Sequence, residues 1–299
     1  MGDSHAKNHD YHLIDPSPWP IFASVAALAT AVGAIAWMRT AQEGVFGITG
    51  PWLFLVSFVA LCFVAYRWWA DVIAESNGGH HTPVVQLHLR YGMIMFIASE
   101  VMFFVAWFWA YFDVALFPAG VYQPTNVVEQ IGLVQRNEVT GGQWPPVQSE
   151  NFQHTFAPWG LPFVNTLILL LSGVTVTWAH HALLEDKRDQ LIYGLAATVI
   201  LGMIFTAMQV YEYGHAAFNF SGHIYGATFF MATGFHGAHV VIGTIFLAVC
   251  LFRAMGGGFT VKKHFGFEAA AWYWHFVDVV WLFLFASIYV WGAGANAGH

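Results

Sequence analysis

Charged residues are scarce in this sequence. Of its 299 residues only 9% are Asp, Glu, Lys or Arg, whereas a soluble domain carries about a quarter. Hydrophobic residues make up 58% and aromatic residues 18%, with 14 tryptophans, and Trp is enriched where a bilayer meets water. This composition excludes an ordinary soluble domain and indicates a membrane protein.

Cysteine is nearly absent as well, and the basic residues form no cluster. Cys62 and Cys250 lie far apart in apolar runs, which favours buried thiols over a disulfide. The formal net charge is −7, so we exclude nucleic acid as a partner. Residues 1–20 lack the basic start, apolar core and cleavage site of a secretory signal, and we expect them to form a polar arm.

Long apolar runs, by contrast, are abundant. A helix needs about 20 mostly apolar residues to cross the hydrocarbon of a bilayer, where its backbone must satisfy its own hydrogen bonds. Seven segments meet this requirement, and they span residues 21–38, 51–69, 92–117, 160–184, 191–211, 222–252 and 269–292. The sequence therefore predicts an all-α membrane protein with seven transmembrane helices.

The positively charged residues predict the orientation of these helices. Eight of the 10 Lys and Arg residues lie in the N-terminal arm or in loops on the same side as that arm. Because Lys and Arg accumulate in cytoplasmic loops, we expect the N-terminus in the cytoplasm and the C-terminus on the opposite side. The opposite side also carries the single long polar connection, about residues 118–159.

Carboxyl groups are rare inside the predicted spans. The first, second, fourth, fifth and sixth segments contain none, whereas Glu100 and Asp113 lie in the third and Asp278 in the seventh. A carboxylate in mid-membrane is costly, so we expect Glu100 to be paired, hydrated or protonated. It could relay protons or substrate, but we favour a group that hydrogen-bonds a neighbouring helix, a lipid or a partner subunit. His275 and Asp278 are three residues apart and are expected to form a structural polar pair.

Two other functions are compatible with some of these residues. His236, His239 and His275 could ligate haem or copper in a membrane metalloenzyme. Histidine in a helical bundle is more often a hydrogen-bonding packing residue, so we expect no metal site in this chain. A proton-coupled secondary transporter could use Glu100, Asp113 and Asp278 as coupling carboxylates, but the sequence shows no inverted repeat.

Several stretches carry a resemblance to a known family. DPSPWP at 15–20 and the long runs at 80–112 and 264–292, which begin HHTPVVQLHLRYG and HFGFEAAAWYWHFVD, resemble signature runs of cytochrome c oxidase subunit III. Shorter stretches resemble the same family: WWADVIAES at 68–76, GGQWPP at 141–146, WAHHALLE at 178–185 and ATGFHGAHVVIG at 232–243. The resemblance extends over nearly the whole chain.

The resemblance implies a fold and a function. A two-helix arm, residues 21–70, and a five-helix bundle, residues 71–299, would form a V-shaped arrangement with phospholipids in its cleft. The chain would be an accessory subunit of a respiratory complex that couples electron transfer from cytochrome c to oxygen reduction and proton pumping. It would pack on and stabilise catalytic subunit I and support proton uptake. Haem and copper would belong to partner subunits I and II, and this chain would have no catalytic residue.

The resemblance also implies particular site residues. Glu100 falls at the intramembrane carboxylate of the family, and four residues fall where relatives contact lipid headgroups: Trp69, Glu75, His81 and Arg253. A ubiquinol oxidase is the alternative to an oxidase of cytochrome c. The third subunit of bacterial ubiquinol oxidases is shorter and lacks the first two helices, whereas both are predicted here with DPSPWP ahead of them, which favours cytochrome c as the electron donor. A connection at 117–143 that is longer than in the mitochondrial form favours a bacterial inner membrane, with the C-terminus in the periplasm.

Overall fold

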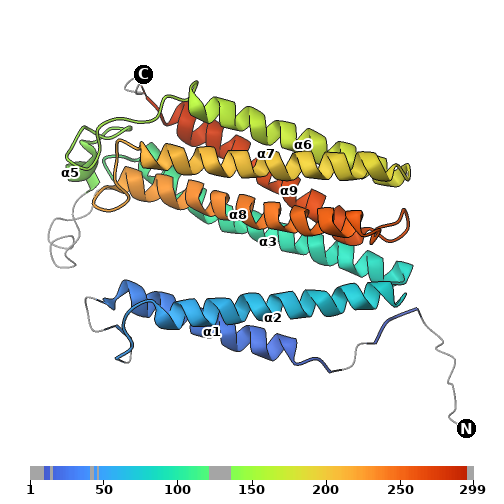
Figure 1. Cartoon of the computed structure of the whole chain (residues 1–299). Helices are drawn as coiled ribbons and strands as arrows, with labels where there is room; N and C mark the ends of the chain where they lie inside the picture. The colour runs from blue at the N-terminus through green and yellow to red at the C-terminus, as the bar shows by residue number, and fades with distance from the viewer. Residues whose placement is uncertain (1–9, 14–15, 41–43, 46, 121–135, 295–299) are drawn as a thin grey trace, which may run out of the picture. The chain divides into compact units, whose positions relative to one another are not determined.

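The computed structural model describes residues 10–13, 16–40, 44–45, 47–120 and 136–294 (Figure 1). Within these ranges the chain is helical and has no strand. Its eight α-helices are α1 (Trp19–Met38), α2 (Trp52–Asn77), α3 (Pro83–Leu116), α5 (Arg136–Thr140), α6 (Leu161–Leu184), α7 (Arg188–Gly214), α8 (Ile224–Met255) and α9 (Phe265–Leu284), and α9 continues as a π-helix, η2 (Phe285–Trp291). Seven helices are long and apolar enough to cross a bilayer, so the predicted all-α fold with seven spans is confirmed.

Two of the helices extend further than the apolar segments predicted. α2 continues past residue 69 to Asn77, and α3 begins at Pro83 rather than at residue 92. The added turns contain charged residues such as Asp71 and Arg90, which an apolarity criterion rejects. They are helical all the same, because a charged residue that reaches the headgroup region retains its solvation and Pro is favoured at a first helical position.

The contacts divide the chain into two compact units, Met1–Leu89 and Arg90–His299, and the boundary lies within α3. The first unit holds α1, α2 and the first turns of α3, and the second holds the rest of α3 and all later helices. The domain boundaries predicted from the sequence, and the V-shaped arrangement, remain predictions.

In the first unit α1 and α2 pack closely against each other (Figure 1). A Cβ atom on Gly33 would lie 2.5 Å from the backbone nitrogen of Phe54, so only glycine permits this approach of the two backbones. At the other end of the pair the indole of Trp19 donates a hydrogen bond to Asp71. The guanidinium of Arg67 lies 5.8 Å from the centre of the Trp19 ring, which adds a cation–π contact between the two helices.

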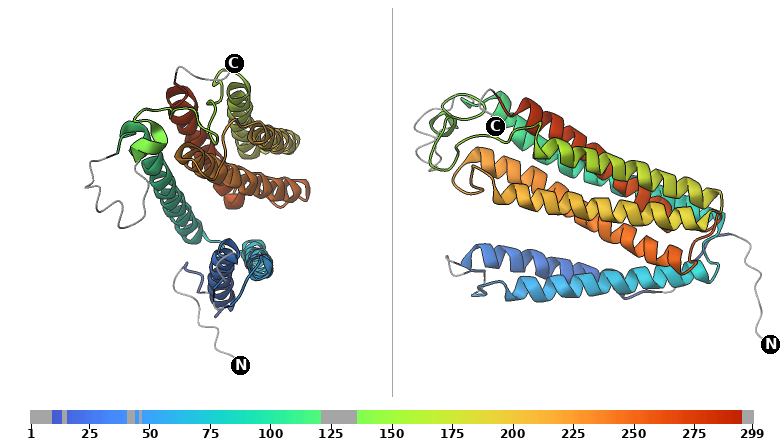
Figure 2. Two further views of the ribbon diagram at one scale, coloured as in Figure 1. Left: turned by 90° about the vertical axis from the view of Figure 1, so that its left-hand side faces the viewer. Right: turned by 45° about the horizontal axis from the view of Figure 1, so that its top comes forward.

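In the second unit α9 lies alongside α6 and α8 (Figure 2) and is the most buried helix. In the most apolar stretch of its span 61% of the residues are buried, compared with 39% in the corresponding stretches of α6, α7 and α8. It packs against α6 and α8. Aromatic side chains connect it to α3, since the ring of Phe276 lies 6.0 Å from that of Phe104 and the ring of Phe283 lies 4.5 Å from that of Phe108. Polar groups on α9 therefore face several helices at once.

The polar connection after α3 is anchored to the end of that helix. Residues 121–135 of the predicted connection lie outside the described residues. The guanidinium of Arg136, in α5, donates hydrogen bonds to the Asp113 carboxylate and to the backbone carbonyl of Phe117. The Thr140 hydroxyl donates to the Pro118 carbonyl at 2.6 Å. These bonds hold α5 at the membrane edge of α3.

Candidate functional site

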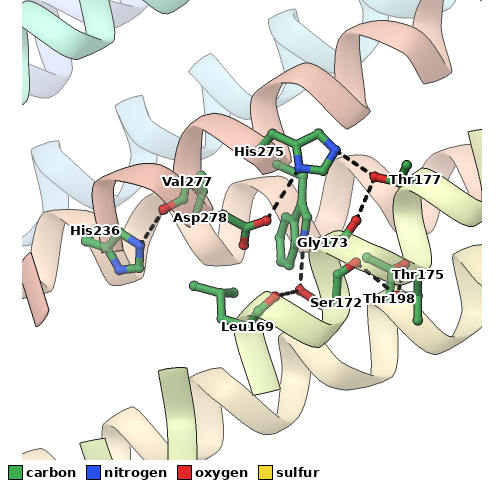
Figure 3. A network of polar contacts seen from close by, with 11 residues as sticks. Leu169, Ser172, Gly173, Thr175, Thr177, Thr198, His236, His275, Val277 and Asp278 are labelled. Carbon is green, nitrogen blue, oxygen red and sulfur yellow. Dashed lines mark hydrogen bonds and ion pairs between the residues drawn. The ribbon is translucent and has the colours of Figure 1, made fainter. Parts of the chain in front are cut away.

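Polar side chains of α6, α7 and α9 meet in the core of the second unit (Figure 3). The indole nitrogen of Trp274 donates to Ser172 Oγ at 2.9 Å. The hydroxyls of Thr175 and Thr198 lie 2.8 Å apart and join α6 to α7. Hydrocarbon supplies no hydrogen-bond partners, so polar groups that meet between helices bind the helices together.

His275 and Asp278 lie side by side at the edge of this network (Figure 3). His275 Nδ1 is 3.5 Å from Asp278 Oδ2, and His275 Nε2 is 3.1 Å from the Thr177 hydroxyl oxygen. That hydroxyl donates its proton to the Gly173 carbonyl at 2.9 Å, so it accepts from His275 Nε2. A Cβ on Gly173 would lie 2.4 Å from Asp278 Oδ2, and glycine therefore makes room for the carboxyl group. The structural role predicted for this pair remains a prediction.

Glu100 faces His239, which connects α3 to α8. His239 Nε2 lies 2.8 Å from Glu100 Oε2, and His239 Nδ1 lies 2.6 Å from the carbonyl oxygen of Phe235. A carbonyl oxygen can only accept, so Nδ1 carries a proton. One further proton must lie between Nε2 and the carboxyl group, as a neutral acid with a neutral imidazole or as an ion pair. Either arrangement leaves the pair without net charge, which is the condition for a carboxyl group in hydrocarbon.

The three histidines considered as metal ligands have separate partners. His236 Nε2 donates to the Val277 carbonyl at 3.2 Å, His239 faces Glu100 and His275 faces Asp278. In the part of the chain that the structure describes, no group of three His, Cys, Asp or Glu residues could hold a metal ion.

The three carboxylates considered for a transporter are also engaged separately. Glu100 pairs with His239, Asp278 with His275, and Asp113 with Arg136. Asp113 lies in the last turn of α3, which ends at Leu116, and so belongs to the membrane edge. These contacts favour packing of the chain's own helices over a shared transport site.

The residues predicted to contact lipid headgroups are placed at helix ends within their own units. In the first unit Trp69 and Glu75 lie on the last part of α2, with Trp69 largely exposed, and His81 lies in the turn before α3. In the second unit Arg253 lies in the last turn of α8, and its guanidinium stacks 4.5 Å from the ring centre of Phe259. Their binding of lipid remains a prediction.

Two titratable groups outside the spans have displaced pKa values. Glu185 follows α6, and its hydrogen bond to the Lys187 ammonium at 2.6 Å lowers the pKa of this exposed carboxyl. His223 precedes α8, and its Nδ1 accepts a hydrogen bond from the backbone nitrogen of Tyr225 at 3.1 Å. Burial lowers the pKa of His223, because desolvation disfavours the imidazolium.

Two important polar groups were missed in the sequence. Arg90 donates to both carboxylate oxygens of Glu268 at 2.9–3.1 Å and so ties α3 to the first turn of α9. Glu212 is buried in α7, which runs to Gly214 and so continues past the predicted fifth segment, 191–211, in which no carboxylate lies. A boundary set by apolarity ends before a polar residue even where the helix continues, and nothing local distinguishes a buried Glu from an exposed one.

The fold and the site together define a multi-pass helical membrane protein whose intramembrane polar side chains join its helices. The family model described as cytochrome c oxidase subunit III matches residues 9–293. Cytochrome c oxidase subunit 3 of Arabidopsis thaliana is 52% identical over 288 residues, which cover 96% of this chain and 98% of the relative. The subunits 3 of Chondrus crispus and Struthio camelus are each 48% identical, over 96% and 95% of this chain and 95% and 98% of the relatives. The chain belongs to the cytochrome c oxidase subunit III family.

Family membership confirms the expectation that this chain is a subunit of a cytochrome c oxidase complex. The chain is an accessory, multi-pass membrane subunit of an oxidoreductase complex that contains other subunits. The family has no redox centre of its own, so electron transfer takes place elsewhere in the complex.

Proposed function

We propose that the chain stabilises catalytic subunit I of the oxidase by direct packing, binds phospholipids and supports proton uptake by the complex. Subunits I and II would hold the haem and copper, and cytochrome c would be the electron donor. The observation that carries this proposal is the pairing of all three predicted intramembrane carboxylates with side chains of the chain itself. Pairs of this kind hold the helices of the subunit together, and a rigid subunit can stabilise the catalytic subunit against which it packs.

Lipid binding is proposed separately for each unit. Trp69 presents an exposed ring near the end of α2, where an indole can lie among headgroups. Glu75 and His81 add polar groups close to the same end. Arg253 is half-buried against Phe259, which fixes its orientation, and a guanidinium forms strong paired hydrogen bonds with a phosphate.

Native mass spectrometry of the intact oxidase tests the lipid proposal. Arg253→Ala removes charge-assisted bonds worth about 1.5–3 kcal/mol, and affinity for a phospholipid should fall by about 10- to 100-fold. Lys263→Ala is the matched control, because it removes an exposed positive charge from the loop that follows α8. Bound lipid that is equally retained in both variants would contradict the assignment of Arg253.

We also infer a bacterial inner membrane, with the N-terminus in the cytoplasm and the C-terminus in the periplasm. The distribution of Lys and Arg supports this orientation, since eight of 10 lie on the side of the N-terminus. The long connection at 117–143 supports the bacterial assignment. The two helices α1 and α2, which ubiquinol oxidases lack in this subunit, support cytochrome c as the donor.

A further inference from the structure

Glu212 is a carboxyl group that the proposed function does not use. It lies in the last turn of α7, and the residue is 2% exposed. Its Oε1 accepts a hydrogen bond from the Tyr289 hydroxyl at 2.6 Å and another from Gln209 Nε2 at 3.3 Å. Its Oε2 is buried and has no hydrogen-bond partner among the described residues. Oε1 thus accepts two hydrogen bonds, whereas Oε2 accepts none from the described residues.

Among the described residues, no positively charged side chain pairs with this carboxyl group. The titratable side chains that face it are tyrosines from three elements, Tyr213 of α7, Tyr225 of α8 and Tyr289 of η2. Phe229 packs 5.4 Å from the Tyr289 ring and closes the site from α8. An ionised Glu212 would be an isolated charge in an aromatic core with two neutral donors, which is a costly arrangement.

The side-chain amide of Gln209, next to Glu212, also has an oxygen without a hydrogen-bond partner among the described residues. This oxygen is Oε1, which is buried, although Gln209 Nε2 already donates to Glu212 Oε1. A carboxylic acid and a primary amide can form a cyclic pair with two hydrogen bonds, and the existing bond is the first of them. The second bond requires one proton on Glu212 Oε2, and this proton would satisfy both unpartnered oxygens. If the Gln209 amide were flipped, so that its oxygen and nitrogen exchanged places, its oxygen would face Glu212 Oε1. Two acceptor oxygens in contact also require a proton between them.

We propose that Glu212 is a buried proton-binding site, in which Oε2 carries a proton at neutral pH and donates it to Gln209 Oε1. The ligand is a single proton, and the site is built by α7 and η2. It is separate from the pairs of Glu100 and Asp278, in which each carboxyl group lies beside an imidazole. Proton binding here keeps charge out of the core where α7 ends.

Infrared spectroscopy of the intact oxidase tests this proposal. Glu212→Gln should assemble as the wild type does, because an amide can replace the acid in both bonds to Gln209 and can still accept from Tyr289. At neutral pH the variant should lose one carbonyl stretching band of a protonated acid, which moves to lower frequency in D₂O. The control is Glu185→Gln, which removes an exposed carboxylate paired with Lys187. It should lose carboxylate bands and no acid band.

Loss of carboxylate bands in Glu212→Gln, as in the control, would overturn the proposal. A second variant keeps the test decisive if Glu212→Gln does not assemble. Tyr289→Phe removes a donor to Oε1 and should move the acid band of the assembled complex to higher frequency. A spectrum in which Tyr289→Phe leaves every acid band unmoved would also overturn the assignment.

Discussion

At the scale of single residues, hydrogen bonds to backbone carbonyls decide which imidazole nitrogens carry protons. The Phe235 carbonyl places a proton on His239 Nδ1, so His239 Nε2 and Glu100 share a single further proton. The Val277 carbonyl similarly places a proton on Nε2 of His236. The backbone of α8 itself thus fixes this proton on His239, whereas the packing of α9 against α8 fixes the one on His236.

Glu100→Gln should leave assembly and proton pumping almost unchanged. The glutamine amide can donate to His239 Nε2, so the contact between α3 and α8 survives without a titratable group. Glu100→Leu removes the partner of a largely buried imidazole and should destabilise the subunit by about 1–3 kcal/mol. Proton-to-electron ratios of the reconstituted complex, with retention of the subunit as the stability measure, check both expectations. A collapse of pumping in a fully assembled Glu100→Gln complex would establish a relay role instead.

The hydrogen bond by which His223 caps the start of α8 should make the stability of the subunit sensitive to acid. Burial lowers the pKa of His223 in the folded protein below its ordinary value of 6.5. Above pH 6.5 the imidazole is neutral in both the folded and the unfolded state, and its bond to Tyr225 contributes fully to stability. This contribution is lost as the pH falls through the lowered pKa of the folded state. Losing the cap should cost about 0.5–2 kcal/mol. Thermal unfolding at about pH 7.5 and about pH 5 should show a larger drop for the wild type than for His223→Asn, since Asn caps a helix without titrating. An exposed histidine is the control, and His154→Asn should retain the drop seen in the wild type.

At the scale of helices, α3 is attached to its neighbours differently from the others. α7 packs against both α6 and α8 through close backbone contacts, whereas α3 reaches α8 and α9 through aromatic rings and two polar pairs. The ring of Trp107 lies 4.9 Å from that of Phe235 on α8. At one membrane edge the bidentate bond between Arg90 and Glu268 adds an electrostatic clamp. Side chains, not backbone proximity, therefore determine the position of α3 in its unit.

Reversal of the Arg90–Glu268 pair tests this clamp. Arg90→Glu alone places two carboxylates together and should destabilise the contact by more than the loss of the pair, which is worth about 1 kcal/mol at this partly exposed site. The double variant Arg90→Glu with Glu268→Arg should recover part of the loss. Recovery should be incomplete because a cation in the first turn of α9 opposes the helix dipole. Thermal unfolding of the four combinations measures the coupling, and a double variant whose destabilisation equals the sum of the two single variants would show that the pair contributes nothing.

At the scale of the whole molecule, the three carboxylates considered for transport or catalysis all pair with side chains of the chain itself. If the purified oxidase is separated into subunits, we expect haem and copper to remain with the partner subunits and this chain to carry neither. Elemental analysis and a visible spectrum of the separated subunit measure this directly. One equivalent of haem or copper in the separated subunit would contradict the expectation.

The sequence by itself determined the membrane class, the seven spans and the family, because apolar runs and signature stretches are local properties of the chain. It also identified Glu100, His275 and Asp278 as unusual, since a polar residue in an apolar run is visible without a structure. Tertiary structure alone decided their partners: Glu100 meets His239 across 139 positions of sequence, and Arg90 meets Glu268 across 178. Whether Glu212 is buried depends on η2, which brings Tyr289 to it from 77 residues away. Such contacts depend on how helices are placed side by side, and no local pattern records that placement.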